Sequence, residues 1–305
     1  MLDLISPPRS RVSAADLHRE VAEYFALGVR VKPGDTVLDV GANIGAFAMH
    51  AAAICKGDLH ILAFEPSPET FDALRTNFAQ NELLRKTRHR LFHLGLCAAV
   101  NAGQTISFYD FARFPTNSTF HLEAKRREFE IFFEDRGRRF AARCRTAVPG
   151  PLGRRLGALV EAATAWVPRG PLGWWITRRV MGLREHTVPV DTLSNVLAAS
   201  LASVRRIDLV KIDVEGPELE ILRGFDAAAW AIVQQVVIET HDRDGRLAEI
   251  AAIVREQGLI DVRMVRQASV DNGLESVILY ACRPEGASTA WPVPQPGAMA
   301  QPLVA

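Results

Sequence analysis

The sequence of 305 residues lacks the features that mark zinc-binding, disulfide-rich and membrane-spanning proteins. It has no CxxC pair, and its few cysteines are far apart, which argues against a zinc knuckle and a disulfide framework. These cysteines are Cys55, Cys97, Cys144 and Cys282. We find neither a signal peptide nor a run of about 20 apolar residues. We therefore expect a cytoplasmic protein with reduced thiols in its core.

A large excess of charge is also missing, but the charges that are present are distributed unevenly. The formal net charge is +1, whereas residues 121–186 hold 14 Lys and Arg against 7 Asp and Glu. This basic segment contains three tryptophans and several Pro and Gly residues, and it interrupts the pattern of the flanking sequence. We expect an insertion with a helix over about 156–167, within an otherwise acidic body.

These features divide the chain into four parts. We expect residues 1–120 to form the first half of the main domain, which carries the candidate ligand-binding loop, residues 121–186 to form the insertion, and residues 187–283 to form the second half of the main domain. Residues 284–305 are rich in Pro, Gly, Ala and Gln, so we expect a disordered tail.

Apolar runs alternate with helical patterns on both sides of the insertion. The run at 36–40 ends in the glycine-rich loop GANIG, and apolar residues at helical spacing follow it. A second run at 61–65 precedes Ser67 and Pro68, which suit the start of a helix. Further strands are predicted at 90–97, 104–109, 207–212, 236–240, 261–265 and 276–282. This alternation predicts a doubly wound α/β fold with a mostly parallel sheet.

The loop after the first strand has the features of a nucleotide site. In doubly wound sheets ligands bind beyond the carboxyl ends of the strands, and Gly41 and Gly45 let the backbone approach a ligand closely. Asn43 replaces the middle glycine that a pyrophosphate needs, which favours S-adenosylmethionine over NAD. We expect Asp39 to attract the ammonium group of this donor. Glu65, at the end of the second strand, is expected to accept hydrogen bonds from its ribose hydroxyls.

Four ionisable side chains at the ends of two later strands are candidates for catalysis. Asp213 and Glu215 follow one apolar strand, and Glu239 and His241 end the next. His241 is the expected general base, because its ordinary pKa of about 6.5 lies near working pH. Asp213 would hold the acceptor hydroxyl, orient His241 or act as the base itself. The four groups could also bind a divalent metal, an alternative that we do not favour.

Together these motifs resemble the FkbM-type methyltransferases. The matching segments are TVLDVGANIGAFA at 36–48, AFEPSPETFDALRTNFAQN at 63–81, VDTLSNV at 190–196, IDLVKIDVEGPELEILRGF at 207–225 and VVIETH at 236–241. The resemblance implies a class I, Rossmann-like fold with a seven-stranded sheet and S-adenosylmethionine as the methyl donor. It also implies a hydroxyl acceptor on a sugar, a polyketide or a related secondary metabolite. The basic, tryptophan-containing insertion would in addition suit a glycan or a lipid-linked glycan. Through the loop FPTNSTF the resemblance adds Asn117 and Ser118 to the candidate donor-binding residues.

The residues alone leave other functions open. A nucleic-acid methyltransferase would use the basic insertion to hold phosphates, but the chain has no recognisable RNA-binding module and no NPPY-type motif. An oxidoreductase is disfavoured by Asn43, and a non-catalytic protein would bind the donor and act through its insertion. We expect the insertion to contact an acidic or amphipathic acceptor, or an anionic membrane to which the protein would be peripheral. The alternative is packing on the body or on a second subunit.

Overall fold

The most apolar runs of the sequence become the central strands of one sheet. The strands β1 (Thr36–Val40), β2 (His60–Phe64) and β7 (Leu209–Ile212) lie side by side, and nearly all of their residues are buried. Continuous apolar strands of this kind form where a parallel sheet is covered on both faces. The computed structural model describes residues 4–147, 150–166, 170–201, 203–242, 245–267 and 276–284.

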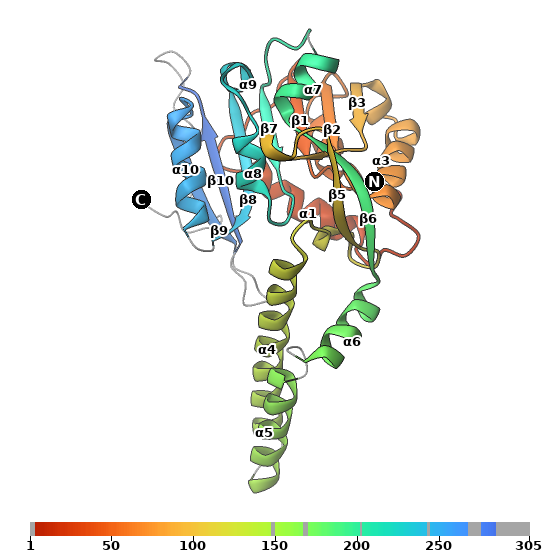
Figure 1. Cartoon of the computed structure of the whole chain (residues 1–305), viewed down its shortest axis with the longest axis vertical. Coiled ribbons are helices and arrows are strands. Elements are labelled where there is room, and N and C mark those ends of the chain that lie inside the picture. The colour runs from red at the N-terminus through yellow and green to blue at the C-terminus, as the bar shows by residue number, and fades with distance from the viewer. Residues whose placement is uncertain are drawn as a thin grey trace.

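The sheet is mostly parallel, and its strand order reverses at β1. In the described part of the chain, seven strands are ordered β3-β2-β1-β7-β8-β10-β9, and β10 runs antiparallel to its two neighbours (Figure 1). The outer strands are β3 (Arg88–Phe92), β8 (Gln235–His241), β9 (Asp261–Gln267) and β10 (Ser276–Cys282). This topology confirms the doubly wound α/β fold, in which ligands bind at the reversal of strand order.

Helices cover both faces of the sheet. The helices α1 (Ala14–Tyr24), α2 (Ala46–Ile54) and α3 (Pro68–Gln80) share one apolar core with Val37 of β1. A second core contains Leu38 and residues of α7 (Leu193–Ser200), α8 (Glu218–Arg223), α9 (Ala227–Ile232) and α10 (Arg246–Glu256). Short 3-10 helices lie at η1 (Leu84–Lys86), η2 (Ala99–Asn101) and η3 (Pro115–Asn117). The sequence analysis did not predict α1.

The single strand expected at 90–97 is divided between two sheets, the main one and a small second one. The chain leaves the main sheet after β3, and β4 (Gly95–Leu96) pairs with β6 (Leu183–Asp191), which in turn pairs with β5 (Gln104–Phe111). The turn brings Gly95 against Phe120, where a Cβ atom would lie 2.5 Å from the ring. β6 begins before residue 186, so the expected end of the insertion falls within a strand.

Most of the segment 121–186 forms a helical arm. The helices α4 (Leu122–Ala147) and α5 (Pro151–Trp166) pack as a hairpin that projects from the body, and α6 (Pro171–Met181) leads back to β6 (Figure 1). Gly157 allows their close approach, because a Cβ atom there would lie 2.9 Å from the carbonyl oxygen of Ala141. α5 confirms a helix in the expected region.

Two further observations concern membrane-spanning helices and the C-terminal tail. Among the helices that the structure describes, none is long and apolar enough to cross a membrane. The expected tail at 284–305 lies, apart from residue 284, outside the described residues.

Candidate active site

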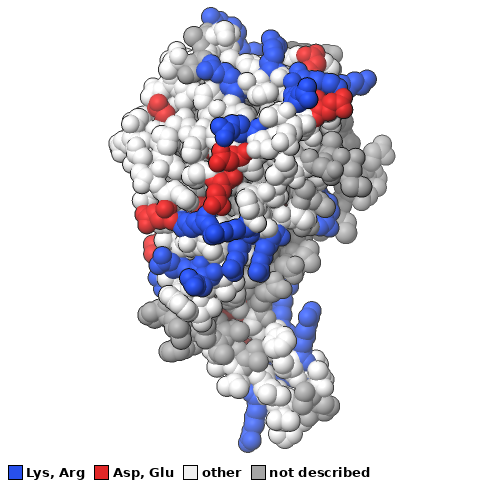
Figure 2. Space-filling view, turned by 90° about the vertical axis from the view of Figure 1, so that its right-hand side faces the viewer, with Lys and Arg blue, Asp and Glu red and all other residues white. Residues whose placement is uncertain are grey.

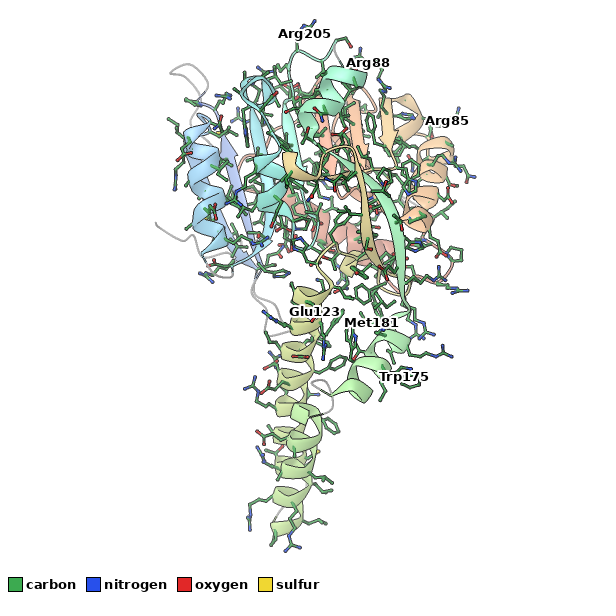
Figure 3. All side chains as sticks on the ribbon, viewed as in Figure 1. Arg85, Arg88, Glu123, Trp175, Met181 and Arg205 are labelled. Carbon is green, nitrogen blue, oxygen red and sulfur yellow. The ribbon has the colours of Figure 1, made fainter. Side chains whose placement is uncertain are left out.

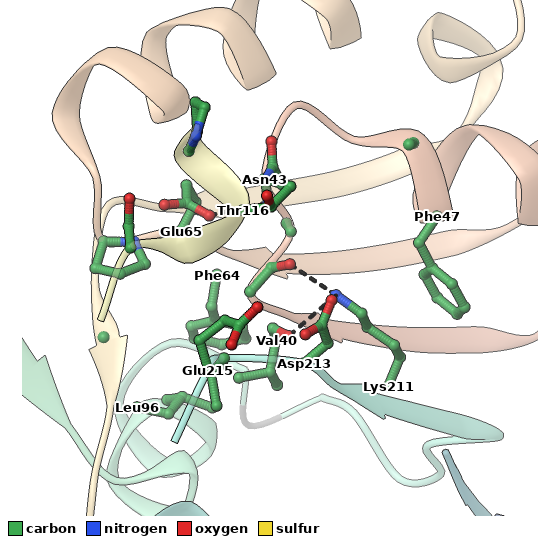
Figure 4. A pocket seen from close by; sticks show the side chains of 18 of the residues that line it. Val40, Asn43, Phe47, Phe64, Glu65, Leu96, Thr116, Lys211, Asp213 and Glu215 are labelled. Atoms are coloured by element: carbon green, nitrogen blue, oxygen red, sulfur yellow. Dashed lines mark hydrogen bonds and ion pairs between the residues drawn. The ribbon is translucent and has the colours of Figure 1, made fainter. Parts of the chain in front are cut away.

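A cavity lies at the reversal of strand order, beyond the carboxyl ends of β1, β2 and β7 (Figure 4). The empty space of this cavity, including its open mouth, is about 910 Å³. The loops after the three strands, the helix α1 and the segment after η3 contribute to its lining. The strand ends expected to carry donor and acceptor residues therefore meet in one place.

The loop after β1 adopts backbone conformations that its sequence allows. Gly41 has a φ of 74°, and a Cβ atom there would lie 1.9 Å from the carbonyl oxygen of Asp213, so only glycine fits against the end of β7. Asn43 has a φ of 49°, which asparagine tolerates better than most residues. Gly41 and Asn43 line the cavity. Gly45 instead caps α2 and faces Leu74, away from the cavity lining.

Glu65 is held rigidly at the cavity wall. Its Oε2 accepts a hydrogen bond from the backbone amide of Asn43 at 2.9 Å, and its Oε1 accepts one from the amide of Ser67 at 2.8 Å. Burial raises the pKa of Glu65 to about 7, against the effect of these two amides. Each carboxylate oxygen keeps acceptor capacity, so the geometry fits the two neighbouring hydroxyls of a ribose.

Asp39 lies beneath the cavity and is not one of the residues that line it in the described part of the chain. Its side chain is fully buried, which raises its pKa, and Lys211 Nζ lies 3.2 Å from its Oδ1. Lys211 also donates a hydrogen bond to the carbonyl oxygen of Gly41 at 2.7 Å. The expected contact between Asp39 and a donor ammonium group stays a prediction, since Asp39 faces the Lys211 ammonium group in this structure. Asp39 neutralises a buried lysine that fastens the ends of β1 and β7 together.

The loop around η3 supplies one of its two expected residues. Ser118 lines the cavity, whereas Asn117 is absent from the described lining and Thr116 takes part instead. The Ser118 hydroxyl donates a hydrogen bond to Asp110 Oδ1 at 3.0 Å, and the Ser67 hydroxyl donates one to the same oxygen at 3.2 Å. The buried Asp110 therefore ties the Ser118 loop to the turn that holds Glu65.

Acidic groups gather on the other side of the cavity, under a tyrosine from α1. The Tyr24 hydroxyl contacts Asp213 Oδ2 at 3.0 Å and also Glu239. Burial and the charge of Asp213 raise the pKa of Glu239 to about 8 and that of Glu20 to about 7. Asp213 and Glu20 line the cavity, while Glu239 lies behind them. Sequence reasoning missed Glu20 and Tyr24, although Leu17, Val21 and Tyr24 have helical spacing.

His241 and Glu215 form an ion pair, with His241 Nε2 3.5 Å from Glu215 Oε2. Burial alone would lower the pKa of His241, but the hydrogen bond and the charge of Glu215 outweigh it and raise this pKa to about 9. Burial would raise the pKa of Glu215, yet Lys125 and His241 lower it to about 2. The pairing with Glu215 favours the protonated ring of His241, so its expected role as general base stays a prediction that the pH dependence of the reaction tests. Only Glu215 of this pair lines the cavity.

A lysine from the arm occupies the position where a metal ion would be expected. Ligand atoms of Glu128, Glu215 and His241 lie within 4.8 Å of one another. Lys125 Nζ lies 2.6 Å from Glu128 Oε2 and 2.7 Å from Glu215 Oε2, so its ammonium group already neutralises both carboxylates. These residues do not fit a divalent ion as they stand, because a second cation would be placed against a buried ammonium group.

The sequence matches the FkbM methyltransferase domain over residues 39–259. The chain belongs to the FkbM methyltransferase family. The 31-O-demethyl-FK506 methyltransferase FkbM of Streptomyces tacrolimicus is 34% identical over 248 residues, covering 79% of this chain and 80% of the relative. Methyltransferase sdnD of Sordaria araneosa is 27% identical over 256 residues, covering 82% and 83%. Hexuronic acid methyltransferase AglP of Haloferax volcanii is 25% identical over 226 residues, covering 74% and 64%.

Membership in the FkbM family confirms the resemblance noted in the sequence. The chain is a methyltransferase, and the family implies S-adenosylmethionine as its methyl donor. The matched residues 39–259 span both halves of the body and the arm between them, and the expectation that the arm is an insertion stays a prediction.

Proposed function

We propose that this FkbM-family methyltransferase transfers a methyl group from S-adenosylmethionine to a hydroxyl oxygen of a sugar, a glycan or a secondary metabolite. The observation that carries the proposal is that Glu65 and Asp213 line one cavity at the switch point of the sheet. Glu65 would accept hydrogen bonds from the ribose of the donor, and Asp213 would accept the proton of the reacting hydroxyl. The name of the relative that acts as a 31-O-demethyl-FK506 methyltransferase supports an oxygen acceptor.

The donor half of the cavity is formed by the first two strand ends. Glu65 would accept hydrogen bonds from the ribose hydroxyls, since both of its oxygens are already oriented by backbone amides. The backbone from Gly41 to Asn43 would pack along the methionine part of the donor, close to Asp213 and Glu20. S-adenosylmethionine supplies an electrophilic methyl group on a sulfonium. The acidic side chains nearby favour the positive charges of the donor.

Asp213 is the proposed proton acceptor. When the acceptor oxygen bonds to the methyl carbon, the carbon–sulfur bond breaks, its electron pair stays on sulfur, and the hydroxyl proton moves to Asp213. The Tyr24 hydroxyl and the charge of Lys211, 3.7 Å from Asp213 Oδ2, hold the carboxylate in place. Such positioning and proton transfer are the two contributions that a protein makes to an in-line displacement.

The surface of the arm supports an acceptor that is anionic or amphipathic. Leu152 and Leu159 on α5 and Trp175 on α6 are exposed, each with more than half of its surface accessible. Trp175 lies on the outer side of α6 (Figure 3), beside the exposed Arg178 and Arg179. Figure 2 shows basic side chains gathered where the arm leaves the body and again along the arm. Arginine next to exposed apolar groups suits a lipid-linked glycan at an anionic surface.

Methyl transfer to oxygen can be tested with S-adenosylmethionine that carries a trideuterated methyl group. The purified protein is incubated with a panel of hydroxylated sugars, polyketides and lipid-linked glycans, and the products are analysed by mass spectrometry. We expect one labelled methyl group per product, in an ether that resists mild base. Labelling of RNA alone, or of nitrogen alone, would contradict the proposal. The Asp213→Asn variant is the matched control for background transfer.

A further inference from the structure

A buried lysine connects the arm to the rim of the cavity. Lys125 lies in the first turns of α4, and only 3% of its surface is exposed. Its Nζ donates a hydrogen bond to Glu215 Oε2 at 2.7 Å and forms an ion pair with Glu128 Oε2 at 2.6 Å. Lysine is almost never buried unless it is paired, because its charge must be compensated. The contact joins the arm to a cavity-lining residue, 90 positions away in sequence.

The loop that carries Glu215 needs such support. Glu215 has a φ of 56°, a left-handed conformation that a non-glycine residue keeps only where the surrounding structure holds it. The Thr119 hydroxyl donates a hydrogen bond to the Glu215 carbonyl oxygen at 2.8 Å, and Arg246 donates one to the carbonyl oxygen of Gly216. The backbone of the loop is therefore held from two sides, and Lys125 holds its side chain.

We propose that Lys125 is a positioning residue that holds the Glu215 carboxylate at the acceptor side of the cavity, so that the start of α4 is part of the active site. This inference rests on the proposed function for its catalytic meaning. Glu215 then accepts a hydrogen bond from the acceptor, beside the hydroxyl that Asp213 deprotonates. The arm is attached to the catalytic rim through this contact, and an acceptor bound along the arm enters the cavity past Glu215.

His241 provides a readout of this role that does not depend on activity. The charged groups that face it are Glu215, Glu128 and Lys125. The pairing with Glu215 raises the pKa of His241, whereas the nearby ammonium of Lys125 lowers it. If Lys125 contributes only its charge, its removal raises the pKa of His241 further. If Lys125 positions Glu215, its removal releases the carboxylate from His241, and the pKa falls from about 9 toward 6.5.

The experiment compares Lys125→Met with the wild-type chain by NMR titration of histidine-labelled protein. The His241→Asn variant identifies the His241 signal. We expect the pKa of His241 to fall in Lys125→Met, kcat to fall about tenfold through loss of acceptor alignment, and donor affinity to stay within twofold. Lys125→Arg retains the ion pair and restores most of the rate. Arg145→Met breaks an exposed ion pair with Glu161 on the arm and serves as the matched control, with no effect on the pKa of His241.

The outcomes separate this proposal from the proposed function. A pKa of His241 that rises or does not change in a folded Lys125→Met variant overturns the positioning role, even if the wild-type chain methylates a hydroxyl. If the wild-type chain fails to bind S-adenosylmethionine, the proposed function fails, while the titration still tests whether Lys125 holds Glu215. If Lys125→Met does not fold, Lys125→Ala is titrated instead, and the same fall in the pKa of His241 is expected, whereas a rise or no change overturns the positioning role.

Discussion

The methyltransferase body and the distal arm, residues 138–160, hold their side chains in different ways. In the body, β1 and β7 are buried on both faces, and every catalytic candidate is fixed by a hydrogen bond or an ion pair to another element. In the distal arm, Phe140 and Leu159 are exposed, and Arg145 forms a surface ion pair with Glu161, which directly follows the distal arm. Surface ion pairs contribute about 0–1 kcal/mol each. We therefore expect the body to set the chemistry and the distal arm to tolerate changes that leave the chemistry unaltered.

The start of the arm holds its side chains as the body does, through contacts with other elements. Thr119 and Lys125 contact the loop of Glu215, and Glu128 completes a buried group of charges with Lys125. A few turns further along α4, the side chains contact α5 and solvent. The boundary between the fixed and the variable part of the molecule therefore lies within one helix, and changes on its two sides should have different effects.

The largest effect is expected from the proton acceptor in the body. Asp213→Asn removes the carboxylate but keeps the shape and the contact with Tyr24. We expect kcat to fall by about 10²-fold or more, because general-base catalysis typically contributes ~10²–10⁴-fold, while donor affinity is retained. Steady-state kinetics with a methylated-product assay measure the rate. Turnover within threefold of wild type would remove Asp213 from the reaction.

Of the acidic residues that follow β2, only Glu65 should contribute to donor binding. Glu65→Gln weakens the hydrogen bonds to a ribose, which are worth about 1.5–3 kcal/mol when charged, so we expect donor affinity to fall at least tenfold. Glu69→Gln is the matched control, because Glu69 lies four residues later and its half-buried carboxylate pairs with Arg184. Equal donor dissociation constants in folded Glu65→Gln and Glu69→Gln would show that the ribose is held elsewhere.

The pH dependence of the reaction separates two roles for His241. As a cation that supports Glu215, it loses its effect when the pH rises through its pKa of about 9, so we expect the rate to fall above pH 9. A general base with the same pKa would give a rate that rises over this range. Rates measured between pH 7 and 10 with saturating donor decide between the two.

The stability of the ligand-free protein should depend on pH through the same ion pair of His241 with Glu215. The folded-state pKa of His241 is raised above its ordinary 6.5, so its contribution to stability is complete below pH 6.5 and is lost as the pH rises through 9. The raised pKa values of Glu65, Glu20 and Glu239 act in the same direction between pH 4.5 and about 8. We expect Tm to fall steadily from pH 5 to 9. In His241→Gln the part of the fall above pH 6.5 should be smaller.

Removal of the distal arm should leave donor binding unchanged. Replacing residues 138–160 by a short Gly–Ser turn keeps Lys125 and shortens both helices of the hairpin at matching positions, since Ala141 faces Gly157. We expect the donor dissociation constant to stay within twofold and KM for a large acceptor to rise several-fold. A loss of donor affinity would show that the distal arm and the body are not independent.

The smallest effect is expected at a lipid surface. Anionic vesicles should bind the wild-type chain weakly in low salt, and added salt should release it, because each basic residue near such a surface contributes about 1 kcal/mol that salt screens. Arg154→Ser combined with Arg155→Ser should weaken this binding, since both side chains are exposed on α5. Co-sedimentation measures it. An absence of binding at low salt would rule out a membrane-bound acceptor and leave a soluble anionic one.

The sequence predicted those parts of the fold that depend on local patterns. Gly41, Asn43 and Glu65 were identified because strand, loop and helix signals fixed their places within a few residues of one another. Tyr24 and Lys125 were missed, because their roles arise from contacts with Asp213 and Glu215 that lie far away in the chain. The charge state of His241 could not be predicted from the sequence either, because it depends on the distance between His241 and Glu215.

Calorimetric titration of the wild-type chain with S-adenosylhomocysteine, and separately with NAD, shows whether the cavity at the switch point is a site for the methyl donor. We expect one S-adenosylhomocysteine bound per chain and no heat of binding with NAD, because the cavity offers Glu65 to a ribose while Asn43 replaces the glycine that a pyrophosphate needs. Binding of NAD, or an absence of binding with S-adenosylhomocysteine, would contradict it.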